Sequence, residues 1–424
     1  MNSDIENSIS HQVSKADFFT SDSRKVAPKS IFVALSGQKN DGHDFADSAL
    51  KQGALAVWVD SKKNRWSANP RVFSAPDVHQ VHRMIAKKFR EKFQGKIVAI
   101  AGSSGKTSTK EFLFTLLSSQ FSTVKTQASQ NGHLGIPLSL EQLRPGIEMA
   151  VIEVGIDGPN DMKAHADIVQ PDLCVLTSIG EEHLRQLINL EGVFREERVL
   201  ADYCLARNGT CFIPNADTWL QKLAQLKNVI SAPNDPTDLF LGIKIEWASA
   251  VMRQNIALAI KTAQFLGVKN ENLLRAIPQL SVPKGRGAAS EIKSGYWVIE
   301  DHYNSNPSSL KTGLKAAQSL SLEKGLSLNV VLGDMLDLGD ETLSYHLELI
   351  NFINSLKIEL LILIGDEFKR ASTAMSHKNT IYFNNSDEAA NYFKTHNLSS
   401  GVYLFKGSRG MALEKALDVF KSKI

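Results

Sequence analysis

Apolar residues recur along the chain with two alternating spacings, one typical of buried strands and one typical of helices. Continuous apolar runs such as IVAIAG, MAVIEVG and LCVLTSIG predict strands that are buried on both faces. Stretches with helical spacing lie between such runs, and residues 78–93 and 248–267 are two of them. Strands that alternate with helices indicate an α/β fold built on mostly parallel sheets.

The same alternation divides the chain into three expected domains. Residues 1–94 contain the runs SIFVAL and ALAVWVD with a helix between them, which predicts a small α/β domain. Residues 95–281 predict a central domain with a mostly parallel sheet, and the turn-rich segment 280–290 predicts the linker that follows it. Residues 282–424 contain four strand-then-loop units and predict a Rossmann-like domain.

Composition narrows the classes of protein that this fold could serve. The 424 residues carry a net charge of +3, which is too small to indicate nucleic-acid binding. Cys174, Cys204 and Cys211 lack the spacing of metal ligands, so we expect reduced thiols in the core of a cytoplasmic protein. The polar, acidic start of the chain is unlike a signal peptide. No run of about 18 apolar residues occurs, so we expect no membrane insertion.

The stretch IVAIAGSSGKTSTKEF predicts a buried strand, a glycine turn and the start of a helix, which together bind phosphate. Gly102 and Gly105 would let backbone N–H groups approach phosphate oxygens. Lys106 would reach the β- and γ-phosphates of ATP, and the Thr107 hydroxyl would hold Mg²⁺. Ile100 stands where the full Walker pattern has a glycine, so the motif is the shorter GxxGKT. An ordinary glycine turn with a surface lysine is the alternative. The predicted loop comprises Gly102, Ser103, Ser104, Gly105, Lys106, Thr107 and Ser108.

Further motifs follow in a fixed order: DSRKVAPKSIFVALSGQKNDGHDF, GSSGKTSTKE, LGIPLSL, EVG, EEHL, EDHYNSNPSS, VLGDMLDLGD and KGSRGM. With these motifs the chain resembles the Mur ligases, which are ATP-dependent amide-bond ligases of peptidoglycan synthesis. The resemblance covers almost the whole chain. It implies a first domain that binds a UDP-sugar, a central P-loop ATPase domain and a Rossmann-like C-terminal domain that brings the incoming amine.

The resemblance implies roles for residues of the first two domains. Ser23 and Arg24 match the family's DSR signature for the UDP-sugar, and Asp41 and His43 match its DGH loop, although DGH could also be an ordinary turn. Asn131 matches a substrate-facing asparagine. Thr107, Glu153 and His183 match residues that the family uses around Mg²⁺ near the γ-phosphate. Asn255 matches an asparagine of the nucleotide-binding helix.

In the third domain the resemblance implies contacts with nucleotide and amine. Asp301, Tyr303, Asn304 and Asn306 match the loop DDSYNANP of the family, in which this chain has Glu300 and His302 at two other positions. Lys406, Ser408 and Arg409 match KGSR, where the cations would offset charge on a transferring phosphoryl group. Arg286 matches the linker motif GR. Among these residues, Asp301 and Lys406 join Lys106, Glu153 and His183 as expected catalytic residues.

The chain also departs from the family pattern. Many members carry a carbamylated lysine fourteen residues after the histidine, where this chain has Glu197. Glu197 could supply the same charge to the metal, or it could be one more charge on an exposed face, REER. The family loop NxNNxxGxP is here SQNGHLGIP, the helix motif HNxxN is here VMRQN, and the segment between PNADTW and VMRQN is short.

The implied reaction joins D-alanyl-D-alanine to a UDP-N-acetylmuramoyl-tripeptide through an acyl phosphate, with ATP and Mg²⁺, in a cytoplasmic monomer. The loops GDMLDLGD and YNSNP favour this branch of the family. Two alternatives stay open. One is a Mur-type or folylpolyglutamate-type ligase that adds another amino acid, and the other is a paralogue that binds nucleotide without ligating. A GTPase is disfavoured because the guanine signature NKxD does not occur.

Overall fold

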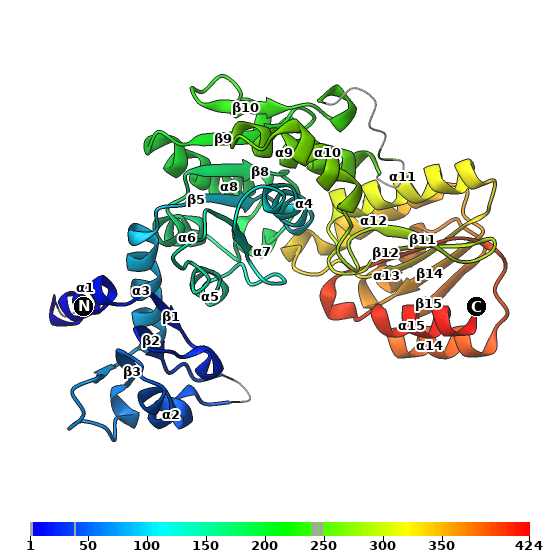
Figure 1. The fold of residues 1–424 in the computed structure, drawn as a ribbon. Coiled ribbons are helices and arrows are strands. Elements are labelled where there is room, and N and C mark those ends of the chain that lie inside the picture. Colours follow the sequence, from blue (N-terminus) through cyan, green and yellow to red (C-terminus); the bar gives the residue numbers. More distant parts are fainter. Residues whose placement is uncertain (1–2, 38–39, 240–244, 246–248) are drawn as a thin grey trace.

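The structure, a computed structural model, describes residues 3–37, 40–239, 245 and 249–424. It contains three sheets, each covered by its own helices, and confirms the predicted three-domain α/β fold (Figure 1). In Figure 1 the N-terminal domain is blue, the central domain is cyan to green, and the C-terminal domain is yellow to red. The long helix α3 (Val78–Lys92) joins the first domain to the second.

The N-terminal sheet has four parallel strands in the order β1-β2-β3-β4. Its strands are β1 (Phe18–Thr20), β2 (Ser30–Val33), β3 (Ala56–Asp60) and β4 (Val72–Ala75), and its helices are α1 (Ser3–Lys15), α2 (Ala46–Lys51) and α3. Trp58 is buried under α1, where its indole N–H donates to Gln12 Oε1 at 2.7 Å. The predicted strands and the helix between them are confirmed, with β2 and β3 slightly shorter than predicted.

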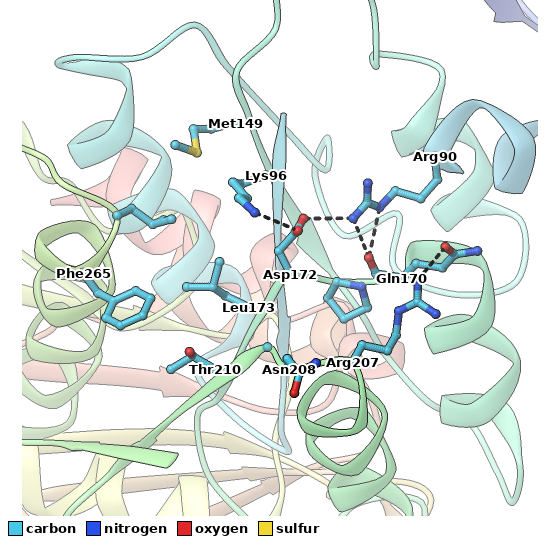
Figure 2. Close-up of a pocket in the computed structure, with 13 residues that line it drawn as sticks. Arg90, Lys96, Met149, Gln170, Asp172, Leu173, Arg207, Asn208, Thr210 and Phe265 are labelled. Atoms are coloured by element: carbon cyan, nitrogen blue, oxygen red, sulfur yellow. Dashed lines mark hydrogen bonds and ion pairs between the residues drawn. The ribbon is translucent and has the colours of Figure 1, made fainter. Parts of the chain in front are cut away.

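Helix α3 is anchored at the edge of the central sheet where its strands begin. The Arg90 guanidinium donates to the carbonyl oxygen of Gln170 at 2.7 Å and to Asp172 Oδ2 at 2.9 Å (Figure 2). A hollow at this edge is also lined by Lys96, Arg207 and the apolar side chains of Leu173 and Phe265. Arg90 holds the end of α3 to the central domain through its bonds to Gln170 and Asp172, whereas Lys96 and Arg207 bond to Asp172 and Gln170 within the central domain.

The central sheet has six parallel strands in the order β10-β9-β8-β5-β7-β6. The strands are β5 (Lys96–Ala101), β6 (Thr123–Lys125), β7 (Met149–Glu153), β8 (Leu173–Leu176), β9 (Thr210–Pro214) and β10 (Val229–Ala232). The helices are α4 (Lys106–Ser118), α5 (Gly135–Leu140), α6 (Asp161–Val169), α7 (Leu184–Leu187), α8 (Leu190–Ala206), α9 (Ala250–Phe265) and α10 (Asn270–Ala276). β5 lies between β7 and β8, so the loops after these three strands meet at one edge, where open α/β sheets bind ligands.

The C-terminal sheet has the order β11-β12-β16-β13-β14-β15 and is parallel except for β11. The strands are β11 (Ala288–Lys293), β12 (Tyr296–Asp301), β13 (Leu328–Gly333), β14 (Leu360–Ile364), β15 (Thr380–Phe383) and β16 (Gly401–Lys406). The helices are α11 (Pro307–Lys324), α12 (Thr342–Asn354), α13 (Asp366–Arg370), α14 (Ser386–Thr395) and α15 (Glu414–Lys423). The linker prediction for 280–290 is wrong at its end, because β11 begins at Ala288 as a largely exposed edge strand.

The helix predicted over 248–267 is confirmed as α9, and its predicted first residue, 248, lies outside the described residues. The three cysteines are free and buried, as predicted. Within the part of the chain that the structure describes, every helix is too short or too polar to cross a membrane.

Candidate active site

The turn between β5 and α4 has a backbone that only glycine adopts easily. Gly102 has φ of 117° and Gly105 has φ of 89°, and both values lie in the left-handed region. A Cβ atom on Gly102 would lie 2.5 Å from Thr177 Oγ1, so space also excludes a side chain there. The turn leads directly into the first residue of α4, Lys106, and therefore presents backbone N–H groups at a helix N-terminus.

The loop that follows β8 holds this turn in shape. The Ser103 N–H donates to the carbonyl oxygen of Ser178 at 2.8 Å, and the Ser104 N–H donates to Ser178 Oγ at 3.0 Å. The Ser103 hydroxyl donates to the carbonyl oxygen of Gly180 at 3.0 Å. On the other side, Asn255 of α9 is buried against Gly105, where a Cβ atom would lie 2.8 Å from Asn255 Nδ2. The structure thus brings the predicted loop residues and Asn255 together.

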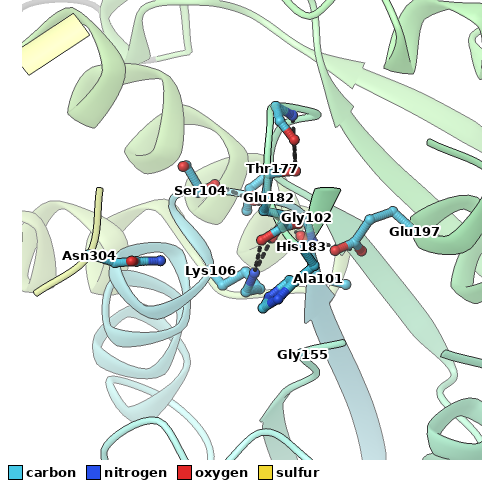
Figure 3. A network of polar contacts seen from close by, with 12 residues as sticks. Ala101, Gly102, Ser104, Lys106, Gly155, Thr177, Glu182, His183, Glu197 and Asn304 are labelled. Atoms are coloured by element: carbon cyan, nitrogen blue, oxygen red, sulfur yellow. Dashed lines mark hydrogen bonds and ion pairs between the residues drawn. The ribbon is translucent and has the colours of Figure 1, made fainter. Parts of the chain in front are cut away.

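Lys106 lies among carboxylates in this turn (Figure 3). Its ammonium donates to the carbonyl oxygen of Gly102 and lies 3.5 Å from Glu182 Oε2. Burial opposes the charge of Lys106, but the charges of Glu182, Glu197 and Glu153 outweigh burial and raise the pKa of the ammonium. Lys106 is therefore a fixed positive charge at the helix N-terminus, as a phosphate-binding lysine requires.

Glu197 lies against the phosphate loop and is completely buried. Its Oε2 accepts the Gly102 N–H at 2.9 Å (Figure 3). The interpretation of Glu197 as an exposed charge is therefore wrong, because Val193, Glu197 and Leu200 share the buried face of α8 while Arg195 points outward. Burial raises the pKa of Glu197 to about 8 against the attraction of Lys106, and the charge of Glu182 contributes to the rise.

The Thr107 hydroxyl and Glu153 meet at the end of β7. Thr107 Oγ1 donates to Glu153 Oε1 at 3.0 Å, and Asn131 Nδ2 donates to the same oxygen at 2.9 Å. Lys110, which is completely buried, lies 3.4 Å from Glu153 Oε2. The sequence indicated Thr107, Glu153 and Asn131 but not Lys110, because a lysine on a helix is ordinarily exposed.

The carboxylates around the loop suit a hard cation. Glu153 Oε2, Glu182 Oε1 and Glu197 Oε1 are buried oxygens without a hydrogen-bond partner. Mg²⁺ prefers oxygen ligands and usually keeps waters and substrate phosphates among them. Over the described residues, no three His, Cys, Asp or Glu side chains are placed to hold an ion by themselves. The donor set therefore fits a Mg²⁺ that nucleotide phosphates would share.

Among the described residues, His183 forms no hydrogen bond or ion pair with Thr107 or Glu153; instead it bridges two domains. His183 Nδ1 lies 2.8 Å from Oδ2 of Asp337, which follows β13 in the C-terminal domain. Near it, the Ser308 hydroxyl donates to Glu181 Oε2 at 2.6 Å. A cleft between the domains has a lining that includes Glu182, His183, Asn304, Asp337, Ser408 and Arg409. One wall of the cleft therefore contains Glu182, which pairs with Lys106 of the phosphate loop, and the other wall contains the predicted amine-site residues Ser408 and Arg409.

In the C-terminal domain, an ion pair between buried Lys406 and partly buried Asp301 joins the ends of two neighbouring strands. Lys406 Nζ, at the end of β16, donates to Asp301 Oδ2 at 2.7 Å and to the carbonyl oxygen of Asn304 at 3.3 Å. The Arg286 guanidinium lies 3.7 Å from the ring centroid of Tyr303. Burial lowers the pKa of Arg286, although Glu153 attracts its charge. Arg286 therefore lies between the loop that carries Tyr303 in the C-terminal domain and the central domain, where it donates to Ser129 Oγ.

Other predicted residues of this domain have local structural bonds. Asn306 is the N-cap of α11 and accepts the Ser309 N–H at 2.8 Å. Ser408 is buried, and its Oγ accepts the Leu336 N–H at 2.9 Å. Arg409 is exposed and pairs with Glu414 at 3.1 Å. All three residues line the cleft, and Arg409 has the most exposed side chain among them.

The predicted UDP-sugar residues lie in the N-terminal domain, away from the phosphate loop. Arg24 is exposed, next to Ser23, and pairs with Asp22 at 2.8 Å. His43 is buried; its Nδ1 lies 2.6 Å from Asp41 Oδ1, and its Nε2 accepts the Asp60 N–H at 2.9 Å. Both nitrogens of His43 are thus used to hold the DGH loop, and the substrate contacts predicted for Ser23, Arg24, Asp41 and His43 stay predictions.

Three α/β domains with mostly parallel sheets, and a phosphate loop whose Lys106 pairs with the cleft residue Glu182, are typical of an enzyme that uses a nucleotide. The sequence matches three family descriptions: "Mur ligase family, catalytic domain" over residues 15–90, "Mur ligase middle domain" over 100–258 and "Mur ligase, glutamate ligase domain" over 286–409. The chain belongs to the Mur ligase family, which confirms the family predicted from the motifs.

Relatives and solved structures agree with this assignment. A UDP-N-acetylmuramoyl-tripeptide–D-alanyl-D-alanine ligase of Buchnera aphidicola subsp. Acyrthosiphon pisum is 30% identical over 438 residues, which cover 94% of this chain and 91% of the relative. The ligase of that name from Bacillus subtilis is 27% identical, covering 95% and 93%. MurF from Acinetobacter baumannii has a TM-score of 0.79 at 24% identity, covering 98% of both chains. MurF from Thermotoga maritima, in complex with ADP, has a TM-score of 0.76 at 24% identity, covering 97% and 98%.

Proposed function

We propose that this chain joins D-alanyl-D-alanine to UDP-N-acetylmuramoyl-tripeptide and converts ATP to ADP and phosphate. The observation that carries the proposal is the position of Lys106, which lies among buried carboxylates at a helix N-terminus and pairs with Glu182, a residue that lines an interdomain cleft. Relatives that align over more than nine-tenths of this chain carry the name of that ligase. Such a cleft would hold the two substrates together and exclude water, so it suits the transfer of an acyl group to an amine.

Each domain would then bind one substrate. Residues 1–94 would bind the UDP-sugar part, with contacts from Ser23, Arg24, Asp41 and His43 as further proposals. Residues 95–281 would bind ATP, and residues 282–424 would bring the amine. Two observations support this division of roles. Helix α3 connects the first two domains and is anchored by Arg90 on Asp172, and His183 contacts Asp337 across the cleft between the second and third domains. Three free, buried thiols support a reducing compartment, and we propose a monomer in the cytoplasm.

The first step would form an acyl phosphate. A carboxylate oxygen of the peptide attacks the γ-phosphorus of ATP, the bond from phosphorus to the β,γ-bridging oxygen breaks, and ADP leaves. The backbone N–H groups of Gly105 and Lys106 and the Lys106 ammonium would bind the phosphate oxygens as charge shifts toward ADP. Bound near Thr107 and Glu153, Mg²⁺ would neutralise charge on the β- and γ-phosphates. Arg286 and Asn255 would hold the nucleotide.

The second step would use the C-terminal domain. The neutral amine nitrogen attacks the acyl carbon, the bond from carbon to the phosphate oxygen breaks, and phosphate leaves with the proton that the nitrogen loses as the amide forms. Asp301 and Lys406 are an ion pair at the ends of β12 and β16, and would orient the loop of Tyr303 and Asn304 toward the nucleotide. Arg409 and Asn306 would face the amine substrate. The positive charge of Arg409 would offset charge on the leaving phosphate.

A nucleotide-binding protein without ligase activity is the second candidate. The changed loop SQNGHLGIP and the neutral form of Glu197 favoured by burial are the observations that support it. A ligase that uses another amino acid would keep the same catalytic loop and differ in the cleft. These candidates differ in which compounds are needed for phosphate release.

Release of phosphate with one component omitted at a time tests the proposal. Purified protein is mixed with ATP, Mg²⁺, UDP-N-acetylmuramoyl-tripeptide and D-alanyl-D-alanine, and the product is weighed by mass spectrometry. We expect release and a pentapeptide product only when all components are present. Binding of ATP without release would support the silent paralogue, and release with a different amino acid in place of the dipeptide would support the other ligase.

A further inference from the structure

The imidazoles of His133 and His165 form a pair beside the loop that carries Asn131. His133 lies in the segment between β6 and α5, and His165 lies on α6. His165 Nε2 and His133 Nδ1 are 3.3 Å apart, and the ring centroids are 4.6 Å apart with the rings tilted by 64°. His165 is buried, whereas the side chain of His133 is 48% exposed. The pair therefore joins the core of α6 to the surface of the loop.

The two outer nitrogens of the pair both face groups that only accept hydrogen bonds. His133 Nε2 lies 2.8 Å from Asp161 Oδ1, and His165 Nδ1 lies 2.9 Å from the carbonyl oxygen of Gly155. Burial would raise the pKa of Asp161, but hydrogen bonds from the Asp157 N–H, His133 and the Gly158 N–H hold it below its usual value. Asp161 is thus ionised, and each ring carries a proton on its outer nitrogen.

The inner nitrogens then determine the charge of the pair. With no further proton, two lone pairs would face each other across 3.3 Å, and with two further protons two N–H groups would collide. One further proton makes an N–H···N hydrogen bond and leaves one positive charge on the two rings. Burial and the charge of His133 lower the pKa of His165, so a positive charge is disfavoured on the buried ring of the pair.

We propose that His133 and His165 share one proton at neutral pH, and that this shared proton positions the substrate-facing loop against β7. Gly155, which follows β7, contacts both the loop that carries Asn131 and His165 of helix α6. Its N–H donates to the carbonyl oxygen of Asn131 at 2.8 Å, and its own carbonyl oxygen accepts from His165. Asn131 in turn donates to Glu153. His133 and His165 are thus positioning residues, and their role in substrate binding rests on the proposed function of the loop.

The charged groups around the pair come from the elements packed against α6. Asp157 and Asp161 precede or begin α6 and lie nearest. From α8, Glu196 accepts the N–H groups at the start of α6. From α3, Lys87 pairs with Asp167. Helix α5 packs on α6 as well and has no charged side chain. Of these groups, Asp161 bonds to the pair directly, so loss of the proton would leave its charge unbalanced.

Two variants remove the shared proton and keep the outer hydrogen bonds. In His133→Gln the amide can still donate to Asp161, and in His165→Asn the amide can still donate to the Gly155 carbonyl. His11→Gln is the control, because His11 is exposed on α1 in the N-terminal domain. The first measurement is NMR of protein labelled with ¹³C at histidine Cε1, from pH 6 to 9. We expect the His133 and His165 signals to titrate together and to hold one proton at pH 7.5; two neutral rings at that pH would overturn the proposal.

The second measurement is hydrogen exchange of residues 129–135, corrected for the intrinsic effect of pH. In the wild type and in His11→Gln we expect protection to fall several-fold over the range in which the pair loses its proton. In His133→Gln and His165→Asn we expect low protection at every pH. Equal profiles in all four proteins would refute positioning by the pair. This readout needs no ligase activity, so it separates this proposal from the proposed function.

Where the ligase reaction is established, KM for UDP-N-acetylmuramoyl-tripeptide gives a third readout. We expect the wild-type KM to rise several-fold with pH over that same range, with a smaller change in kcat. The two variants should have a raised KM that no longer depends on this titration. A wild-type KM profile in both variants would contradict the link from the pair to substrate binding, even if the NMR result were as expected.

Discussion

At the scale of single residues, the charge of Glu197 is the most sensitive feature of the phosphate loop. Its Oε2 accepts the Gly102 N–H, while its Oε1 has no hydrogen-bond partner. Burial raises its pKa to about 8, so the carboxyl is largely neutral at pH 7. A cation or a proton can therefore occupy the side of Glu197 that faces away from Gly102.

Glu197 should make the stability of the protein fall as pH rises. Its usual pKa is 4.5 and its pKa in the fold is about 8. Between these values the unfolded chain loses the proton and the folded chain keeps it, so unfolding is favoured increasingly up to about pH 8 and constantly above it. Glu197→Gln should remove this slope and raise the free energy of unfolding at pH 8 by on the order of 4 kcal/mol.

Thermal unfolding from pH 5 to 8, without Mg²⁺ or nucleotide, measures this effect. Glu191→Gln on the exposed side of α8 is the matched control and should keep the wild-type slope. A wild-type slope in Glu197→Gln would show that the buried carboxyl is ionised. A Mg²⁺ titration of ATP turnover in the same variant tests whether Glu197 also serves the metal: a raised requirement is expected if it does.

Lys106 carries the largest expected effect on turnover. Lys106→Ala removes the ammonium that would bind the β- and γ-phosphates, while the buried carboxylates around it remain. We expect ATP turnover to fall by at least about 100-fold. The fold should be retained, as judged by circular dichroism. Lys227→Ala, on an exposed segment of the central domain, should turn over ATP like the wild type. Undiminished phosphate release in Lys106→Ala would refute the assignment of the loop.

At the scale of elements, the turn between β5 and α4 depends on both the backbone angle and the space around Gly102. Its φ of 117° disfavours a side chain, and Thr177 Oγ1 and the Ser178 backbone fill the place that a Cβ atom would take. Gly146 has a similar φ of 89° but nothing lies within 4 Å of its Cβ position. The two glycines therefore separate the cost of backbone strain from the cost of a steric clash.

Gly102→Ala should destabilise the central domain by at least about 3 kcal/mol and abolish nucleotide binding, because the loop must move away from β8. Gly146→Ala should cost roughly 1 kcal/mol and leave nucleotide affinity unchanged. Melting temperature and ATP affinity by calorimetry measure the two effects. Equal destabilisation by both substitutions would contradict the importance of the contacts to Thr177 and Ser178.

Much of the fold could be predicted because buried strands are continuous apolar runs. β5, β7 and β8 of the central sheet appear in the sequence as such runs. Edge strands break this rule: β11 is largely exposed and β15 only half-buried, so their residues resemble a loop. Helix α9 was predictable because its buried positions recur with helical spacing.

The predictable part of the site lies where motifs follow strands. The glycine turn, Thr107 and Glu153 occur at the ends of β5 and β7, so the topology alone brings them together. Lys110 and Glu182 could not be found, because their roles depend on tertiary contacts that sequence spacing does not show. The buried position of Glu197 was hidden by the charged residues beside it on α8.

At the scale of the whole molecule, the central and C-terminal domains meet through polar contacts at the cleft. His183 pairs with Asp337 across the cleft, and Glu181 accepts from Ser308 close by. A histidine whose Nδ1–H is held by a carboxylate presents a fixed Nε2 to other ligands. We therefore predict that Asp337 orients His183 when the domains are together, and that this domain contact would complete the proposed metal site.

Asp337→Asn should weaken this orientation without changing the phosphate loop. We expect the Mg²⁺ concentration for half-maximal turnover to rise by about 10-fold, because loss of a carboxylate partner commonly weakens a metal site to that extent. Asp340→Asn, at an exposed position in the same loop, is the control. Unchanged Mg²⁺ dependence in Asp337→Asn would place His183 outside the metal site.

The most direct test of the proposed ligase mechanism follows one oxygen atom through the reaction. UDP-N-acetylmuramoyl-tripeptide is prepared with ¹⁸O in the carboxylate that is joined to the amine, and the phosphate released with ATP and D-alanyl-D-alanine is analysed by mass spectrometry. An acyl phosphate breaks between carbon and oxygen when the amine attacks, so each phosphate should carry one labelled oxygen from the peptide. Phosphate without label, or phosphate released at the same rate without the dipeptide, would contradict the proposed ligase mechanism.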